Sequence, residues 1–429
     1  MTIRYSRRSF FAHARTALAS IGFTSLMTPI RSFGVEIPPP KDDGVDYYAK
    51  LGVQQIINAA GTYTFLTAAV MPESVQLAVA RAAKHPVRLE QLQLAAGAYL
   101  AKRLHCESAL VSAGAASALT LGTAACVTVA NGQRGEQIPP LIPQGMDSLK
   151  DEVIMQKGHR YGYDHALLSC GVRIVEVETL DEYRAAFTPK TVMTHFFNAA
   201  TSGTISREDW IRVSHEHNVP SMNDAAADMP PISNLWKYTQ MGFDLVCFSG
   251  GKGIRGPQNA GLLLGKKELI SAAARNNNPI DNVVGRGQKV AKEQIVGMVA
   301  AVDWLLSQTD EEMEKEFRGR AQRVADYLSS VPTLTSQIYV PEVANHVPTL
   351  LLRYDQQKVK IAPLEVADMC RHGSPSIELH PATGSPEPGL PSDANTIVVG
   401  VWMLQAGQDL IVAKRLKQIL MKASGTRTT

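Results

Sequence analysis

Short apolar segments alternate with helical patterns through much of the chain, and this alternation restricts the folds open to it. Helical periodicity appears at residues 74–83 and 89–104, and a further helix is predicted to begin at Ser206, with Asp209 completing a capping box. Strands joined through helices at this spacing pair in parallel, so we predict an α/β fold with a mostly parallel sheet covered by helices. The predicted strands are residues 53–58, 109–112, 152–156, 172–177, 191–197, 219–223 and 244–249.

The pattern changes after Asn276, where long helices precede shorter, mixed segments. At 429 residues the chain exceeds one ordinary compact core, so a second domain is expected. We predict an N-terminal arm at 35–60, a large domain at 61–275, and a bridging helix with a small α+β domain at 276–429. The elements predicted in the last part are helices at 295–307, 311–330 and 408–421, strands at 348–353 and 396–401, and a Pro/Gly-rich stretch at 373–391.

The first 34 residues have the layout of an export signal. The run Ser6-Arg7-Arg8-Ser9 resembles the start of a twin-arginine signal, an apolar stretch follows at 17–27, and Ser32-Phe33-Gly34 offers small residues for cleavage. An ordinary amphipathic helix that contains an Arg-Arg pair is the alternative interpretation. The signal interpretation predicts the twin-arginine translocase as a partner and a periplasmic or exported location.

The charge and the cysteines argue against several classes of protein. The formal net charge is +3, but residues 1–34 hold five arginines and no acid, which leaves the remainder slightly acidic. Nucleic-acid binding needs a surplus of basic residues, so no nucleic-acid partner is expected. No apolar run of roughly 20 residues is present for stable membrane insertion. The five cysteines are scattered without CxxC spacing, which favours buried free thiols over disulfides or metal ligands.

Small residues follow the predicted strand 109–112. Gly114-Ala115-Ala116-Ser117 opens a helix that runs to about residue 129, and N–H groups at a helix start attract phosphate. Ligands collect at the carboxyl ends of strands in such sheets, which makes this turn a candidate phosphate site. Small residues at a strand–helix turn also serve packing alone, and the sequence leaves both interpretations open.

Two charged residues follow two of the predicted strands. Asp224 comes directly after strand 219–223, and Lys252 follows strand 244–249 within the run Ser249-Gly250-Gly251-Lys252-Gly253. At one edge of a parallel sheet they would lie side by side. A lysine amine can bind an aldehyde cofactor, and a carboxylate keeps a pyridine nitrogen protonated, so the pair indicates pyridoxal 5′-phosphate (PLP). The alternatives are a helix cap for Asp224 and a solvated loop cation for Lys252, while a P-loop lacks its Ser or Thr after the lysine.

The lysine segment resembles that of a known enzyme family. Phe248-Ser249-Gly250-Gly251-Lys252, with Gly256-Pro257-Gln258, is similar to the lysine motif of the bacterial selenocysteine synthase (L-seryl-tRNA selenium transferase) family. Ile57-Asn58-Ala59-Ala60-Gly61 resembles its first-strand motif. The likeness extends from about Leu51 to the C-terminus and is closer to the D-glucosaminate-phosphate ammonia-lyase subfamily. Two expected departures from the tRNA enzyme favour that subfamily: we expect an export signal in place of the tRNA-binding domain, and the remaining chain is not basic.

The resemblance implies the fold of type I PLP-dependent transferases and assigns roles to residues. Lys252 would form the Schiff base with PLP, and Asp224 would pair with the pyridine nitrogen. Ser249 and the Gly114–Ser117 turn would hold the phosphate. His159, after strand 152–156, would stack on the cofactor ring and could donate a proton to a leaving group, with a surface-loop histidine as the alternative.

Three further candidates follow from the same resemblance. Asn198, after strand 191–197, would approach the phenolic oxygen of PLP. Arg286 is a candidate anion contact, and Arg371 is a candidate for the substrate carboxylate because its planar fork matches that group. For both arginines, a structural role at the surface is the alternative.

The implied activity is that of a PLP-dependent lyase. We expect β-elimination and deamination of an amino acid or amino-sugar acid, giving a 2-oxo acid and ammonia. The alternatives are a racemase or epimerase, a selenocysteine-synthase-like transferase without a tRNA domain, and a protein without activity, although retention of Asp224 and Lys252 opposes the last. By the same resemblance, the chain would form homodimers or larger homo-oligomers.

Overall fold

The computed structural model describes residues 44–132 and 142–425. The chain divides into two units, residues 1–53 and 54–429. The first contains the short helix α2 (Tyr47–Lys50), which begins where the Asp46 carboxylate accepts hydrogen bonds from the Tyr48 and Ala49 N–H groups, at 2.9 and 3.2 Å. The predicted export signal at residues 1–34 lies outside the described residues. All other described elements belong to the second unit.

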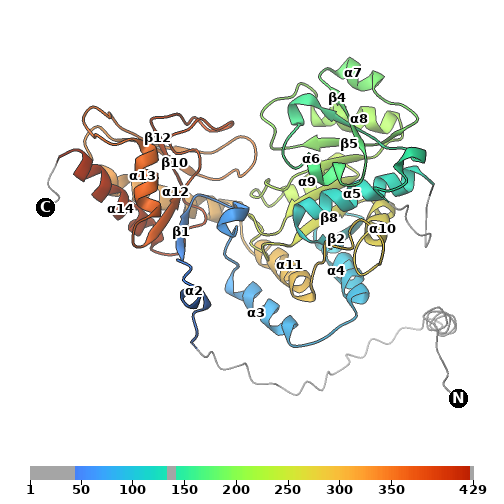
Figure 1. The fold of residues 1–429 in the computed structure, drawn as a ribbon, viewed down its shortest axis with the longest axis horizontal. Coiled ribbons are helices and arrows are strands. Elements are labelled where there is room, and N and C mark those ends of the chain that lie inside the picture. Colours follow the sequence, from blue (N-terminus) through green and yellow to red (C-terminus); the bar gives the residue numbers. More distant parts are fainter. Residues whose placement is uncertain (1–43, 133–141, 426–429) are drawn as a thin grey trace. The chain divides into compact units, whose positions relative to one another are not determined.

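A seven-stranded sheet is the largest in the second unit (Figure 1). Its strands are β2 (Ser108–Ser112), β3 (Glu152–Gln156), β4 (Arg173–Val177), β5 (Thr191–Phe197), β6 (Ser221–Asp224), β7 (Leu245–Ser249) and β8 (Gly261–Gly265). They lie in the order β2-β8-β7-β6-β5-β3-β4. Only β8 runs opposite to its neighbours, and every other pairing in this sheet is parallel. The predicted α/β class with a mostly parallel sheet is confirmed.

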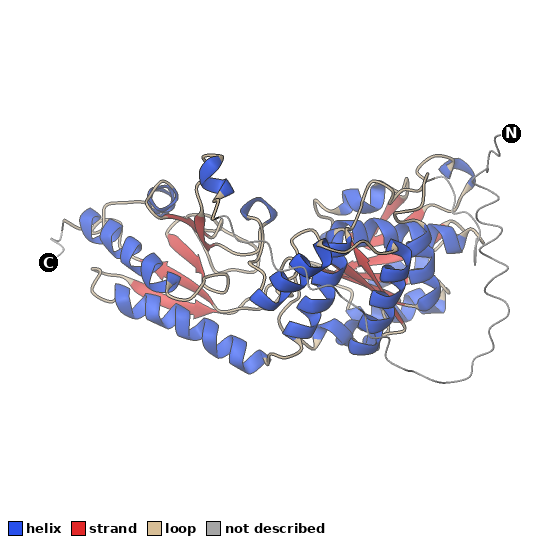
Figure 2. Ribbon diagram, turned by 90° about the horizontal axis from the view of Figure 1, so that it is seen from below, coloured by secondary structure: helices blue, strands red, loops and turns tan. Residues whose placement is uncertain are grey.

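Helices cover both faces of this sheet (Figure 2). They are α3 (Glu73–Ala83), α4 (Leu89–Arg103), α5 (Gly114–Ala130), α6 (Asp164–Leu168), α7 (Leu180–Ala185), α8 (Arg207–Glu216), α9 (Asn234–Met241), α10 (Lys267–Arg275) and α11 (Lys292–Leu305). Under α5 and α10 lies a core that includes Met222 and Leu245. The other face has its own core, which includes Phe196 of β5 and Trp210 of α8. Burial on both faces explains why the strands are apolar runs rather than alternating ones.

The C-terminal part of the chain, together with β1 (Ile56–Ala59), forms two smaller sheets. The other strands are β9 (Thr335–Tyr339), β10 (Thr349–Arg353), β11 (Ser376–Leu379) and β12 (Thr396–Gly400), and the helices are α12 (Asp310–Leu328), α13 (Pro363–Arg371) and α14 (Gln408–Ala423). Strands β12-β10-β9 are antiparallel, whereas β1 pairs in parallel with β11. A separate core fills this part, with Leu350 and Leu416 fully buried. A strand is present in the region predicted at 53–58, but its predicted place as the first strand of the main run is wrong, because β1 pairs with β11 and lies outside the seven-stranded sheet.

Local sequence accounts for helix starts to different degrees. The Ser206 hydroxyl caps α8 by accepting a hydrogen bond from the Asp209 N–H at 3.1 Å. The Asp209 carboxylate, however, contacts the Ser206 hydroxyl rather than its backbone N–H, so the predicted capping box is only half formed. A complete box occurs at α7, where Thr179 and Glu182 each satisfy a backbone N–H of the other.

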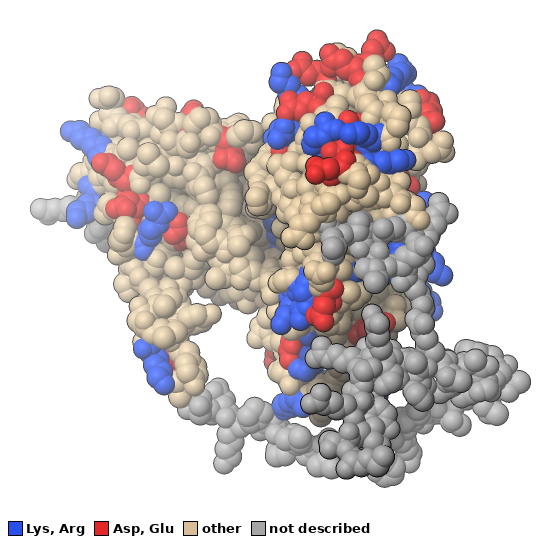
Figure 3. Space-filling view, turned by 45° about the vertical axis from the view of Figure 1, so that its right-hand side comes forward, with Lys and Arg blue, Asp and Glu red and all other residues tan. Residues whose placement is uncertain are grey.

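Basic and acidic side chains are interspersed on the face drawn in Figure 3. Several charged side chains of the molecule form exposed ion pairs, among them Lys157 with Glu178 and Arg212 with Asp209. Each such pair contributes about 0–1 kcal/mol, so they support solubility more than the fold. Within the part of the chain that the structure describes, no helix is both long and apolar enough to cross a membrane.

Candidate active site

Lys252 lies in a tight turn that directly follows β7. A backbone hydrogen bond from the Gly250 N–H to the Ala260 carbonyl, at 2.8 Å, closes the turn. A Cβ on Gly253 would lie 2.3 Å from the carbonyl oxygen of Met229, so only glycine allows this approach. The glycines therefore shape the turn that presents the lysine.

The Lys252 amine lies near two aspartates at the carboxyl edge of the sheet. Burial lowers the pKa of the amine below its ordinary value, and the negative charges of Asp224 and Asp228 oppose this shift. Strands β6 and β7 are parallel neighbours, with Asp224 paired opposite Cys247. The structure thus brings Asp224 and Lys252 together as the sequence predicts.

The Asp224 carboxylate is held at both oxygens. Oδ1 accepts a hydrogen bond from the Ala226 N–H at 2.9 Å, and Oδ2 accepts one from the Tyr161 hydroxyl. Burial, together with the Asp224 charge, raises the pKa of Tyr161, so the phenol keeps its proton and donates it. The Tyr161 ring also stacks on Phe197, with 3.9 Å between the ring centroids. Sequence analysis did not identify Tyr161, although it lies close after β3 in an aromatic-rich loop.

His159 packs on the opposite side of β5 from Tyr161. Its ring meets Phe196 edge-on, with 4.5 Å between centroids, and successive residues such as Phe196 and Phe197 point to opposite faces of a strand. Nδ1 accepts a hydrogen bond from the Phe197 N–H at 3.2 Å, and Nε2 faces the Gln156 side-chain amide at 3.2 Å. Burial lowers the pKa of His159 to about 4, which leaves it neutral at pH 7. This packing disfavours the predicted stacking and proton-donor roles of His159.

The first turn of α5 lies against the end of β8. A Cβ added to Gly261 would be 2.5 Å from the Gly114 carbonyl carbon, so the two backbones approach closely. Ser249 pairs opposite Gly261, which brings it to the same place. The N-cap residue, Ala113, makes no side-chain hydrogen bond, so the N–H groups of the turn from Gly114 to Ala116 can face an anion. The predicted phosphate site, which we call the phosphate cradle, therefore has backbone N–H groups at the start of α5 that can donate to a phosphate.

Ser117 and Arg286 differ from their expected roles. The Ser117 hydroxyl donates to Gln288 Oε1 at 2.8 Å, which leaves only its backbone for a phosphate. This bond ties the loop that contains Arg286 to the cradle. The Arg286 guanidinium pairs with Asp281 at 3.2 Å, so a carboxylate of the same loop competes with any bound anion.

Asn198 is at the predicted edge, but its side chain is already engaged. Its N–H donates to the Asp224 carbonyl at 3.1 Å. The side chain donates to Asp228 Oδ2 at 2.8 Å and accepts from Arg207 Nε at 2.9 Å. These bonds disfavour the predicted contact with the phenolic oxygen of PLP. Asp228, which is buried, was not identified from the sequence.

Arg371 ends α13 and is paired within the C-terminal part. Its Nε contacts both carboxylate oxygens of Glu378 on β11, at 3.0 and 3.1 Å. Because the guanidinium already binds a carboxylate, the structural alternative is favoured over the predicted contact with the substrate.

Comparison with known proteins identifies the family. The model of the family described as L-seryl-tRNA selenium transferase matches residues 56–315, which is more than half of the chain. The chain belongs to the L-seryl-tRNA selenium transferase family. The matched region contains both Asp224 and Lys252, so the resemblance seen in the lysine motif is confirmed.

Three relatives of this selenium transferase family member differ in the extent of the match. It is 28% identical over 346 residues to the 5′-C-glycyluridine monooxygenase-decarboxylase of Streptomyces sp, covering 77% of this chain and 83% of that protein. It is 25% identical over 358 residues to the D-glucosaminate-6-phosphate ammonia lyase of Salmonella typhimurium, covering 80% and 92%. With the L-seryl-tRNA(Sec) selenium transferase of Mannheimia succiniciproducens it shares 28% identity over 242 residues, 51% and 50% of the two chains.

Solved structures agree on the fold of this family member. A structure of D-glucosaminate-6-phosphate ammonia-lyase matches it with a TM-score of 0.75 at 23% identity, over 89% of this chain and 99% of that one. A structure of SPT with PLP matches with a TM-score of 0.51 at 12% identity, over 87% and 89%. The fold is that of type I PLP-dependent enzymes, as predicted, and the chain is an enzyme with PLP as its cofactor.

The residues present fit the chemistry of PLP. The cofactor has an aldehyde, a pyridine nitrogen and a phosphate, and the site offers a partly buried amine, a carboxylate and an uncapped helix N-terminus in the same order. Lys252 would hold the aldehyde, Asp224 the pyridine nitrogen, and the Gly114 turn with Ser249 the phosphate.

Proposed function

We propose that this family member is a PLP-dependent lyase that removes water from a 2-amino-3-hydroxy acid and releases a 2-oxo acid and ammonia. The observation that carries the proposal is the Lys252 amine close to Asp224 at the carboxyl edge of the sheet. The substrate class is an amino acid or an amino-sugar acid. The match with an ammonia lyase along most of both chains supports this class.

The chemistry divides between the cofactor and two side chains. PLP, when bound, supplies a ring that accepts the electron pair left at the substrate Cα. Lys252 takes the Cα proton, and its lowered pKa keeps the amine unprotonated at a lower pH than an ordinary lysine. Asp224 holds the proton on the pyridine nitrogen.

Lys252 can also serve the leaving group. Its ammonium group returns a proton to the departing β-hydroxyl, so water leaves as the Cα–Cβ double bond forms. The released 2-amino-2,3-unsaturated acid takes up a proton at Cβ and becomes an imine, and water then hydrolyses the C=N bond to give the 2-oxo acid and ammonia. Lys252 takes the role of proton donor because the buried His159 is neutral and both of its ring nitrogens are engaged.

A substrate panel tests the reaction. Purified holoenzyme should release ammonia and a 2-oxo acid in equal amounts from one or more D- or L-2-amino-3-hydroxy acids, including amino aldonic acids. Both products are measured in the same reaction, with the corresponding 3-deoxy compound as the control that cannot lose water. Amino transfer to an added 2-oxo acid without ammonia would contradict the lyase, and inversion at Cα without elimination would favour the racemase.

We propose that the protein is exported to the periplasm by the twin-arginine translocase. The Arg7-Arg8 pair ahead of an apolar stretch supports this. Replacing both arginines with lysine keeps the charge but removes the pair, so the enzyme should remain folded and active in the cytoplasm. Cell fractionation and the mass of the N-terminal peptide check the result. Finding the unaltered protein only in the cytoplasm, with its first residues intact, would contradict the proposal.

We also propose that the protein forms a homodimer or a larger homo-oligomer. The family resemblance supports this, as does an apolar groove of about 610 Å³ beside α4 and α10, where the exposed side chains of Leu94 and Ile280 would be covered by a partner. Light scattering of the purified protein should give at least twice the mass of the chain. A monomer at micromolar concentration would contradict it.

A further inference from the structure

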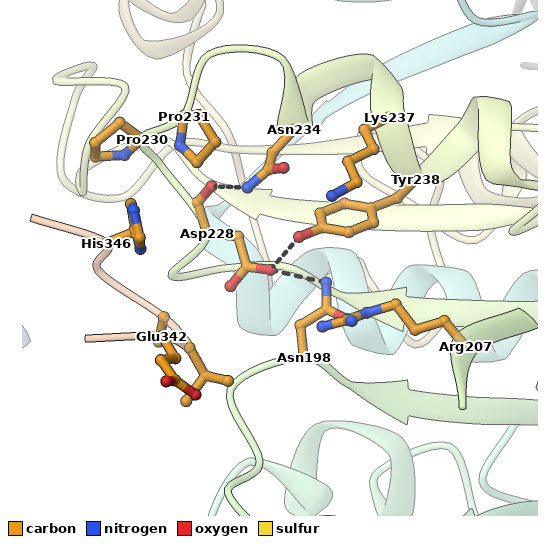
Figure 4. Close-up of a pocket in the computed structure, with 12 residues that line it drawn as sticks. Asn198, Arg207, Asp228, Pro230, Pro231, Asn234, Lys237, Tyr238, Glu342 and His346 are labelled. Carbon is orange, nitrogen blue, oxygen red and sulfur yellow. Dashed lines mark hydrogen bonds between the residues drawn. The ribbon is translucent and has the colours of Figure 1, made fainter. Parts of the chain in front are cut away.

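A polar pocket of about 240 Å³ lies beside the Lys252 site and takes no part in the proposed chemistry. It is formed by the segment after β5, by α8 and α9, by the loop after β6, and by the loop at residues 342–346 (Figure 4). Arg207 and Lys237 lie at one end of it, Glu342 and His346 at the other, and Asp228 between them. The pocket is therefore polarised along its length.

The pocket shares a wall with the Lys252 turn. Gly253 packs directly on the carbonyl oxygen of Met229, the residue next to Asp228. Asn198 lines the pocket, and its backbone N–H donates to the Asp224 carbonyl at 3.1 Å. The pocket therefore adjoins the Lys252 turn, with Asn198 and the backbone of Met229 between them.

The cationic end is prepared for an anion. Arg207 is fixed by its hydrogen bond to Asn198 and lies over the rings of Phe196 and Tyr238, with 5.5 and 5.9 Å from the guanidinium carbon to the ring centroids. Among the described residues, neither Arg207 nor Lys237 has an acidic partner in an ion pair. The terminal nitrogens of Arg207 are therefore free for a bidentate contact.

Asp228 in the middle of the pocket supplies the opposite chemistry. Its Oδ2 accepts hydrogen bonds from Asn198 and from the Tyr238 hydroxyl, each at 2.8 Å. Its Oδ1 is buried and has no hydrogen-bond partner among the described residues, with the residue only 7% exposed. A buried carboxylate oxygen without a donor is costly, and a ligand hydroxyl would supply the missing donor.

We propose that this pocket binds the distal part of the substrate, a hydroxylated chain that ends in a phosphate. The hydroxyl group donates to Asp228, and the phosphate lies between Arg207 and Lys237. Two cations without acidic partners match a group with two negative charges, whereas Glu342 at the other end repels it and so fixes the direction of the chain. This inference rests on the proposed function for the position of the reacting end at Lys252.

Calorimetry with inorganic phosphate tests the anion site without any turnover. The holoenzyme should bind phosphate, and Arg207→Gln and Lys237→Gln should each weaken binding by about tenfold or more, because each removes a charge-assisted contact. Arg212→Gln is the matched control, since it removes the same charge further along α8 and should bind phosphate as the parent does. Lys237 is exposed, so its variant is expected to fold even if Arg207→Gln does not. Equal binding by parent and Lys237→Gln, or no binding by the parent, would overturn the proposal.

A pair of substrates separates a substrate phosphate from a free phosphate effector. A 2-amino-2-deoxy aldonic acid and its 6-phosphate differ only in the distal group. Lys237→Gln should raise KM for the phosphorylated compound by about tenfold and leave KM for the other unchanged, and free phosphate should compete with the phosphorylated compound. Phosphate that binds without competing would overturn the substrate assignment. If neither compound reacts but the phosphorylated one alone displaces bound phosphate, the lyase proposal is contradicted and the assignment of the pocket as a phosphate site is supported.

Discussion

Replacing Lys252 with alanine should lower turnover by about 10³-fold or more, because it removes both the attachment point of the cofactor and the base at Cα. The variant should still fold. The Asp224 carboxylate keeps its hydrogen bonds from the Ala226 N–H and the Tyr161 hydroxyl when the Lys252 amine is removed. Borohydride reduction followed by peptide mass spectrometry should find a pyridoxyl group on Lys252 in the parent and on no residue in the variant.

A lysine at the other edge of the same sheet provides the control. Lys266 follows β8, which runs opposite to β7, and its exposed ammonium group pairs with Glu107 at 2.8 Å. Lys266→Ala should keep both the adduct and the turnover of the parent. An adduct on a residue other than Lys252, or a Lys252→Ala variant with parental turnover, would contradict the assignment of the site.

Strand positions in the main sheet were predictable because burial on both faces requires continuous apolar runs. Strands β3 and β5 lie at the predicted residues, and β7 begins one residue later than predicted. The sequence did not predict β8, since Gly261 and Gly265 bracket a run of only three leucines that is too short to interpret by itself. Its antiparallel pairing with β7 and β2 depends on long-range contacts that no local pattern contains.

The same limit applies to the smaller sheets. Strand β9 is partly exposed and polar at its start, which gives no hydrophobic alternation. Strand β11 lies inside the Pro/Gly-rich stretch and is recognisable only through its pairing with β1. Parallel pairing between residues more than 300 positions apart is decided by tertiary packing, which local propensity does not contain.

The candidate site was predictable where strand ends decide it and unpredictable where side-chain packing does. Asp224 and Lys252 follow neighbouring parallel strands, so their meeting needs only the topology of the sheet. Whether His159 or Tyr161 reaches Asp224 depends on which face of β5 each ring packs against, and the sequence of a loop does not specify this. Arg371 looked suitable for a carboxylate, and it does bind one, but that carboxylate is Glu378.

Replacing Asp224 with asparagine should slow turnover by about 10²–10³-fold while the cofactor stays attached to Lys252. Asparagine keeps the shape of the side chain and can still accept the hydrogen bond from the Ala226 N–H at one position. Its amide nitrogen cannot accept a hydrogen bond at the other position, where Oδ2 of Asp224 in the parent accepts one from the Tyr161 hydroxyl. The pyridine nitrogen then loses the partner that keeps it protonated. A steady-state assay measures the loss of turnover, and the borohydride adduct on Lys252 shows separately that the cofactor stays attached.

A cofactor analogue distinguishes an electronic role for Asp224 from a structural one. PLP methylated at the ring nitrogen carries a fixed positive charge that needs no carboxylate, and Asp224→Ala leaves room for the methyl group. The Asp224→Ala variant should therefore regain a measurable part of its turnover with the methylated cofactor, whereas the parent should gain nothing from it. If Asp224 only supports Tyr161 and the backbone of Ala226, the analogue should restore no activity, because neither contact depends on the charge of the ring. Turnover restored in the variant alone would show that Asp224 acts by keeping the pyridine nitrogen positively charged.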